Sequence, residues 1–253
     1  MRFDILTIFP QLFEAFRSTG VLGKAIERGK ISLEIADLRD WADNRWNQVD
    51  DEPYGGGAGM VIQAPPVVAA VRELQKMGAG GSPRTVILTP RGRRLDQRLV
   101  EELACESHII IACGRYEGFD ERVFEILQPD EISLGDFILG GGEVAAMALI
   151  ESVSRLIPGV VGDPESVTED SFFGGLLDYP CYTRPATVEG LDVPEVLRSG
   201  NHSAIRRWRL ARAVAITVTR RPDLVKENWN RYSEEVRRLV GPDPPDDGAD
   251  TSR

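Results

Sequence analysis

Cysteine and histidine are scarce in this chain of 253 residues, which has three cysteines and two histidines. Cys105, Cys113 and Cys181 are odd in number and widely spaced, so they predict neither a disulfide framework nor a metal-binding motif. His108 and His202 are too few and too far apart for a metal site or a Ser-His-Asp triad. This scarcity favours a reducing cytoplasm as the location of the protein. It argues against a disulfide framework, a metal site built from Cys or His, and a Ser-His-Asp triad.

Long hydrophobic runs are also missing. No apolar stretch approaches the roughly 18 residues that a membrane-spanning helix needs, and the opening MRFDILTIFP lacks the basic region and cleavage site of a signal peptide. The chain is 42% hydrophobic and 28% charged, as is typical of a soluble globular protein, so we expect a cytoplasmic location. The formal net charge of −10 argues against nucleic acid as a partner unless basic residues gather locally.

Residues 1–158 alternate between β-rich and helical patterns. Strands are expected at 2–9, 31–38, 85–88, 108–112 and 131–134, and helices at 11–28, 64–77, 96–104, 120–127 and 143–157. Such alternation predicts an α/β fold, a parallel sheet with helices on both faces. Ligands of such sheets bind beyond the carboxyl ends of the strands. Three turns, 89–92, 113–118 and 135–142, follow strands and are expected to converge there.

The rest of the chain divides into three segments. Residues 159–185 are rich in Gly, Pro and acids and are predicted to be a flexible interdomain loop. Because a mere joint would be shorter, this segment is either a disordered linker or a loop with a function. Residues 186–240 are predicted to form a small all-α domain with eleven Lys and Arg against four Asp and Glu between Arg198 and Arg238. This excess of +7 favours a phosphate-binding surface over a solvated face that packs Trp208 inward. Residues 241–253 are predicted to be a disordered acidic tail.

The glycine run before the last helix of the sheet domain has several interpretations. Gly140–Ala145, GGGEVA, matches the dinucleotide template G-x-G-x-x-A. Glu143 would occupy the helix N-terminus where a pyrophosphate should bind, and its charge would repel that group. The pattern therefore suits a cationic ligand without phosphates, such as S-adenosylmethionine. A nucleotide-dependent oxidoreductase and a tight turn without a ligand remain the alternatives.

Two other polar residues also have purely structural explanations. Arg155 follows Glu151 by four residues on a predicted helix, so a surface ion pair accounts for it. Asp170 follows Ser166 and Glu169, whose spacing is that of a capping box, so a helix start accounts for it. The residues alone leave both roles open.

Nine motifs, in order, give the chain a resemblance to the bacterial tRNA (guanine-37-N1)-methyltransferase family over roughly residues 1–240. They are FDILTIFP (3–10), DDEPYGGGAGM (50–60), TPRGRRLDQ (89–97), CGRYEGFDERV (113–123), ISLGDFILGGGE (132–143), SRLIPGVVG (154–162), TEDSF (168–172), YTRP (182–185) and SGNHSAIRRWR (199–209). The resemblance implies a knotted (SPOUT) methyltransferase that uses S-adenosylmethionine, with a trefoil knot at the C-terminal end of the sheet domain. Pattern alone predicts an open sheet, because chain knots are rare.

The resemblance also implies partners and residue roles. It implies an obligate homodimer with the active site at the subunit interface, and the tRNA anticodon arm as partner, without DNA or membrane. Asp170 would be the general base, Arg155 the partner of the guanine oxygen and Glu117 a guanine contact. The implied cofactor-binding residues are Leu88, Thr89, Pro90, Gly92, Gly114, Tyr116, Gly118, Leu134, Gly135, Asp136, Phe137, Ile138, Leu139, Gly141 and Gly142. The implied substrate-binding residues are Tyr54, Gly55, Ser171, Asp178, Arg206, Arg207 and Arg209.

The sequence departs from the family at two positions. Gly140 stands where Ser or Thr is usual, and Cys181 replaces a common His, so Cys181 receives no role. Family members are described as needing magnesium, yet no motif of this chain identifies its ligands, and no metal-binding residue is predicted. A noncatalytic RNA-binding adaptor remains the third hypothesis; tRNA binding without methyl transfer would favour it.

Overall fold

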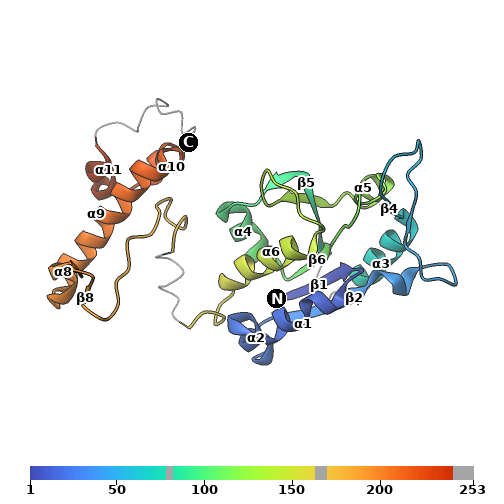
Figure 1. Cartoon of the computed structure of the whole chain (residues 1–253), viewed down its shortest axis with the longest axis horizontal. Coiled ribbons are helices and arrows are strands. Elements are labelled where there is room, and N and C mark those ends of the chain that lie inside the picture. The colour runs from blue at the N-terminus through green and yellow to red at the C-terminus, as the bar shows by residue number, and fades with distance from the viewer. Residues whose placement is uncertain (78–81, 163–169, 242–253) are drawn as a thin grey trace. The chain divides into compact units, whose positions relative to one another are not determined.

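A computed structural model describes residues 1–77, 82–162 and 170–241 of the chain (Figure 1). The chain forms two compact units, residues 1–164 and 165–253, and each is described by itself. Of the predicted tail only Gly241 is described, and the capping-box residues Ser166 and Glu169 lie outside the described ranges. Within these ranges, no helix combines the length and the apolar character that crossing a bilayer requires.

The first unit is built on a five-stranded parallel sheet, which confirms the predicted α/β fold. The strand order is β2-β1-β6-β5-β7. The strands are β1 (Arg2–Thr7), β2 (Ser32–Asp37), β5 (Arg84–Arg94), β6 (His108–Ala112) and β7 (Asp130–Ser133). A separate antiparallel pair consists of β3 (Asp50–Asp51) and β4 (Val61–Ile62).

Helices connect the strands of this unit. They are η1 (Pro10–Phe13), α1 (Glu14–Ser18), α2 (Gly20–Glu27), η2 (Leu38–Trp41), α3 (Ala64–Lys76), α4 (Gln97–Ala104), α5 (Arg122–Leu127) and α6 (Glu143–Arg155). The single helix expected at 11–28 is wrong, because Thr19 adopts an extended backbone and Gly20 follows at φ +66°. The strand expected at 85–88 is too short, since β5 resumes its pairing with β7 at Arg93.

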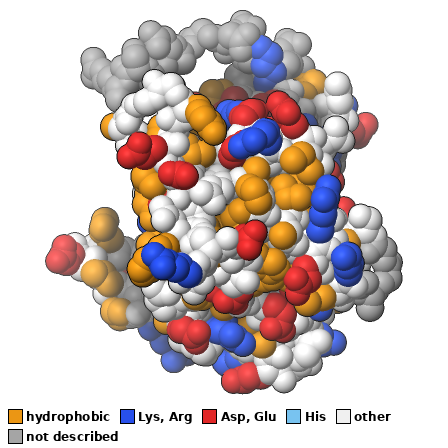
Figure 2. Space-filling model, turned by 90° about the vertical axis from the view of Figure 1, so that its right-hand side faces the viewer, with side chains coloured by type: hydrophobic (Ala, Val, Ile, Leu, Met, Phe, Trp, Pro, Cys, Tyr) orange, Lys and Arg blue, Asp and Glu red, His pale blue; other side chains and the backbone are white. Residues whose placement is uncertain are grey.

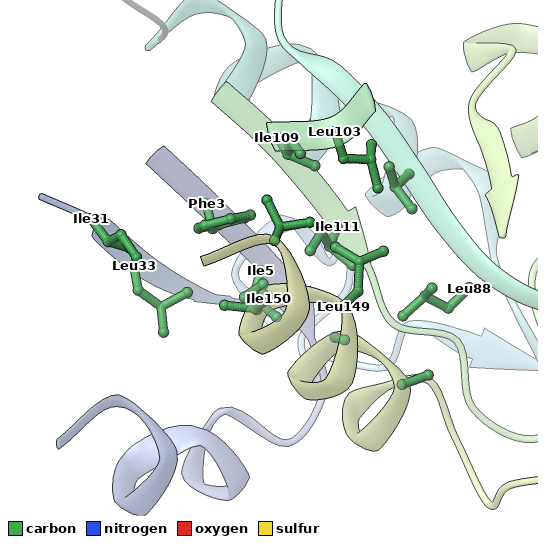
Figure 3. Packing of buried hydrophobic residues seen from close by; sticks show 14 of the residues in the cluster. Phe3, Ile5, Ile31, Leu33, Leu88, Leu103, Ile109, Ile111, Leu149 and Ile150 are labelled. Atoms are coloured by element: carbon green, nitrogen blue, oxygen red, sulfur yellow. The ribbon is translucent and has the colours of Figure 1, made fainter. Parts of the chain in front are cut away.

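Side chains alternate between two buried layers on either face of the sheet. Phe3 and Ile5 of β1 belong to the layer that includes α4 and α6, whereas Leu6 belongs to the layer that includes α3 and α5. Figure 3 shows Leu149 and Ile150 of α6 packed against the strands. Burial of both faces explains the apolar run HIIIA of the central strand β6.

The second unit is mostly helical. Its helices are α8 (Glu195–Arg198), α9 (His202–Arg220), α10 (Pro222–Asn228), η3 (Trp229–Arg231) and α11 (Glu234–Val240). Its core includes Val214, Val225, Tyr232 and Val236. The Tyr232 hydroxyl donates to the carbonyl of Gly175 at 2.7 Å, so part of the predicted interdomain loop is attached to this helical core.

The segment 186–240 also contains a small hairpin that the sequence analysis did not expect. Strands β8 (Thr187–Val188) and β9 (Leu191–Asp192) pair antiparallel. The two residues between them, Glu189 and Gly190, have φ angles of +52° and +79°, as two-residue hairpin turns of the primed type require. The description of 186–240 as all-α therefore needs this correction.

Candidate active site

A cavity of about 440 Å³ opens at the carboxyl ends of β6 and β7 and at the turn that follows Leu88 within β5. Its wall includes residues of the turn after Leu88, of the turn after β6 and of the loop 134–142 after β7. The prediction that these three turns converge is therefore confirmed. Figure 2 views the molecule from the side toward which β1 points in Figure 1, and hydrophobic, acidic and basic side chains are intermixed on this face.

Most residues predicted to bind a cofactor line this cavity, together with Glu117. They are Leu88, Thr89, Pro90, Gly114, Tyr116, Gly118, Leu134, Gly135, Phe137, Ile138, Leu139, Gly141 and Gly142. Gly92 and Asp136 are not among the lining residues: Gly92 is packed against the backbone of β7, and Asp136 is exposed. Which of these residues contact a cofactor stays a prediction.

The structure adds lining residues that had been given no role, although Arg91 and Arg115 lie in two of the predicted turns. They are Arg91, Arg115, Phe119, Glu121, Phe124, Ile132, Ser133 and Ala145. Ala145 could have been found, because it follows Gly142 by three residues at the start of α6 and so shares its face of the helix. Phe119 belongs to the motif CGRYEGFDERV but was given no role, and Phe124 belongs to no motif; only the folded chain places both beside the glycine turns.

Close contact between the turns explains the glycines. The Gly142 N–H donates to the carbonyl of Gly114 at 2.9 Å, and a Cβ on Gly142 would lie 2.9 Å from the Cα of Cys113. A Cβ on Gly92 would lie 2.4 Å from the carbonyl carbon of Glu131. Real Cβ atoms do not approach backbone this closely, so both turns need glycine at these positions.

We expect Gly142→Ala to be destabilising and Gly140→Ala to be tolerated. An added methyl group at 142 meets immovable backbone, and such overpacking costs about 1–3 kcal/mol. At Gly140 the nearest atom to an added Cβ is the Nη1 of Arg115, at 3.8 Å, so a small side chain fits there. Thermal unfolding of both variants checks this; equal melting temperatures would contradict the close contact at Gly142.

The carboxylate of Glu143 is buried in a polar network at the start of α6. It has no exposed surface, and its Oε1 accepts a hydrogen bond of 2.8 Å from the Thr7 hydroxyl at the end of β1. Its Oε2 lies 2.8 Å from the Nε of Arg115. The Nε–H is not aimed at that oxygen, so the contact is an ion pair rather than a hydrogen bond.

This network corrects the interpretation of the GGGEVA stretch. Glu143 does not present its negative charge directly to a ligand, because it is buried and paired with Arg115, and it is not in the cavity wall. Burial raises the pKa of the neighbouring Cys113 thiol well above its usual value, and the Glu143 carboxylate adds to this effect. Cys113 is therefore a neutral thiol at physiological pH.

The turn after β6 is tied to the 50–60 loop, which carries two predicted substrate contacts. The N–H of Glu117 donates to the carbonyl of Met60 at 3.0 Å. Its carboxylate lies directly over Gly59, where an added Cβ would be 2.5 Å from Oε1. Tyr54 and Gly55 are fully exposed further along this loop, so the structure places them in the same unit as the cavity.

Other predicted site residues belong to the second unit, where several are connected. The Ser171 hydroxyl oxygen accepts the N–H of Asp178 at 2.9 Å, and the Asp178 carboxylate accepts the N–H of Tyr179 at 2.7 Å. The guanidinium of Arg209 lies 4.7 Å from the centre of the Tyr179 ring. Asp170 directly precedes Ser171 in the chain, and its carbonyl accepts a hydrogen bond from Phe173 at 3.4 Å.

Arg155 is not part of the cavity of its own chain. It is the exposed last residue of α6, whereas Ala145 lines the cavity near the beginning of that helix. Ten residues of α-helix separate their Cα atoms by about 15 Å. Arg206 and Arg207 are exposed on α9 of the second unit.

In residues 1–77, 82–162 and 170–241, no group of three or more His, Cys, Asp or Glu side chains is placed to hold an ion. The predicted requirement for magnesium therefore has no residues assigned to it.

A parallel sheet with a cavity at its strand-end turns is typical of α/β proteins that bind small organic ligands. The sequence model of the family described as tRNA (Guanine-1)-methyltransferase TrmD matches residues 1–227. The chain is 50% identical over 242 residues to a tRNA (guanine-N(1)-)-methyltransferase of Rhodopirellula baltica, covering 94% of this chain and 100% of the relative. Proteins of the same name from Moorella thermoacetica and Bacillus subtilis are each 48% identical and cover 95% of this chain and 98% of their own length. The chain belongs to the tRNA (guanine-1)-methyltransferase family.

Proposed function

We propose that this protein transfers a methyl group from S-adenosylmethionine to N1 of guanosine 37, 3′ of the anticodon, in cytoplasmic tRNA. The observation that carries the proposal is the cavity formed by three glycine-containing turns in a chain of the tRNA (guanine-1)-methyltransferase family. Family membership supports the reaction class, and the cavity supports a bound small-molecule donor.

The cavity fits the proposed cofactor in size and chemistry. Its volume of about 440 Å³ lies in the range of small-molecule sites, which are mostly apolar with a few polar groups. Glycines let a flat ring approach the backbone, because no Cβ stands in the way. We propose that backbone groups of Leu134, Gly135, Phe137 and Leu139 read the adenine ring. S-adenosylmethionine, when bound, supplies an electrophilic methyl group on sulfur.

Three side chains are proposed to act on the guanine. Its N1 carries a proton and is a poor nucleophile, so Asp170 accepts that proton as the methyl group is transferred. Negative charge then develops on O6, and the guanidinium of Arg155 stabilises it. Glu117, which lines the cavity, contacts the base and helps to align N1 with the methyl group.

The distance along α6 supports an active site shared by two copies of the chain. Arg155 lies about 15 Å from Ala145 along the helix, so we propose that the partner supplies Arg155 as well as Asp170. Hydrophobic side chains at the cavity mouth support a partner at this place. Tyr116, Phe137, Ile138 and Leu139 line the cavity and are 39–79% exposed, which is unusual for a surface that faces only water.

We also propose that the chain is knotted at this site. Ile132 of β7 is the register partner of both Leu88 and Arg93, so β5 contacts β7 on either side of the intervening turn. Gly92 in that turn packs directly on the peptide between Glu131 and Ile132. Such tight wrapping of one segment around a strand end supports the trefoil knot that the family resemblance implies.

The second unit is proposed to hold the anticodon arm through phosphate contacts. We expect Arg206→Ala/Arg207→Ala to weaken tRNA binding and to reduce the slope of log affinity against log salt by about one per arginine lost. Lys24→Ala/Arg28→Ala, on exposed positions of α2 and its end, is the control, because it removes the same charge from the sheet unit. Equal slopes for the two double variants would contradict an RNA surface on α9.

Mass analysis of tRNA incubated with the protein and methyl-labelled S-adenosylmethionine tests the proposed function directly. We expect one labelled methyl group on N1 of guanosine 37 and none on a transcript that carries adenosine at this position. Binding of tRNA without transfer of label would contradict the reaction and favour an RNA-binding adaptor. Label on another base would contradict the assigned target.

A further inference from the structure

The cavity wall carries a cation whose counter-charge lies behind it. Arg115 lines the cavity with a side chain that is 24% exposed, whereas the Glu143 carboxylate, 2.8 Å away, has no exposed surface. The guanidinium also donates to the carbonyl of Gly140 at 3.0 Å and lies 4.6 Å from the ring centre of Phe9. The Thr7 hydroxyl donates a hydrogen bond of 2.8 Å to the other carboxylate oxygen of Glu143. The pair is therefore fixed with its positive member toward the cavity.

The other charged groups of the wall are arranged differently. Arg91 forms ion pairs of 2.9 Å with Glu121 and 2.6 Å with Glu131, and these side chains are all at least 32% exposed. Glu117 lies over the 50–60 loop. Water screens charges at exposed positions, whereas a buried carboxylate acts on its surroundings through a medium of low dielectric constant. Glu143 is thus the acid near the wall whose charge is screened least.

We propose that the Glu143 carboxylate, by offsetting the positive charge of Arg115, sets the relative affinity of this cavity for the cationic methyl donor and its neutral product. The proposal rests on the proposed function, in which a sulfonium is bound before transfer and a thioether remains afterwards. With the carboxylate present, the two charges of the pair largely cancel at the distance of a bound ligand. Without it, the guanidinium repels the sulfonium and leaves the affinity for the neutral thioether unchanged.

The test compares the dissociation constants of S-adenosylmethionine and S-adenosylhomocysteine, measured by titration calorimetry on the full chain. The two compounds differ only in the transferred methyl group and the charge on sulfur. We expect Glu143→Gln, which keeps the shape and an acceptor for Thr7, to weaken binding of the donor about tenfold relative to the product, or about 1.4 kcal/mol. Arg115→Gln should shift the ratio the opposite way, and the double variant should restore it.

Thr7→Val is the matched control, because it removes the hydrogen bond to Glu143 without changing a charge. We expect it to alter both dissociation constants by the same factor. If Glu143→Gln does not fold, Arg115→Gln still tests the sign of the effect. Equal changes for both compounds in the charge variants would overturn the inference and leave the proposed function intact. Wild-type protein that binds neither compound would overturn the proposed function and the inference with it.

Discussion

Asp170→Asn is expected to reduce the single-turnover rate of methyl transfer by about three orders of magnitude. Asparagine keeps the size and the hydrogen-bonding shape of the side chain but cannot accept the N1 proton of guanine, and a positioned general base contributes roughly 10²–10⁴-fold. Because Asp170 belongs to the second unit and the cavity to the first, affinity for S-adenosylmethionine should stay within a few-fold. Rapid-quench measurements at saturating tRNA and cofactor give the rate of the chemical step.

Asp223→Asn is a suitable control for this experiment. It makes the same chemical change in the same unit, at an exposed carboxylate that pairs with Arg221 at 2.5 Å. Exposed ion pairs contribute at most about 1 kcal/mol, so we expect an unchanged rate. A normal rate for Asp170→Asn would remove Asp170 as the base, and an equal loss in both variants would point to a general effect on the second unit.

Mixed dimers test whether two copies share the active site. Asp170→Asn retains an intact cavity, whereas Gly141→Val retains Asp170 but drives its side chain into Arg115, because even a Cβ there would lie 2.2 Å from Nε. If the partner supplies Asp170, a dimer of these two inactive chains contains one complete site. We expect differently tagged chains, purified as the mixed dimer, to recover about half of the wild-type activity. Mixed dimers that stay inactive would contradict the shared site.

The sheet was predictable because its signal is local. HIIIA was expected as a strand and is β6, with every residue buried. Burial on both faces makes such a run apolar throughout, and this pattern needs no knowledge of its neighbours. The hairpin at β8 and β9 was missed because its strands have only two residues each, too few for any period to be visible.

The cavity was predictable in position but not in all its chemistry. Glycine turns after parallel strands mark the carboxyl edge of the sheet, and this rule located the turns that now line the cavity. The state of Glu143 could not be foreseen, because it depends on Thr7 and Arg115, which are distant in sequence and meet it only after folding. Glu143 was correctly expected at the start of α6, but its burial and its ion pair with Arg115 were not expected.

Arg155→Ala is expected to lower the chemical step by about two orders of magnitude or more. Charge that develops on O6 of the guanine is stabilised most by a group already in place and shielded from water, and loss of one such group costs about 10²–10³-fold. Arg155→Lys should recover only part of the rate, because an ammonium lacks the planar fork of the guanidinium. Single-turnover kinetics should show the loss in the rate constant; an effect confined to KM would contradict the assigned role.

Glu151→Ala separates this role from a surface ion pair on α6. Glu151 is exposed one helical turn before Arg155, so a purely structural function of the arginine predicts similar losses in both variants. We expect Glu151→Ala to keep a normal rate.

Mixed dimers then identify the chain that supplies the arginine. Because Arg155 lies about 15 Å along α6 from Ala145 in the cavity wall of its own chain, a mixed dimer of Arg155→Ala with Gly141→Val should regain activity, and one with Asp170→Asn should not. Rescue by Asp170→Asn would instead place Arg155 and the cavity in the same chain.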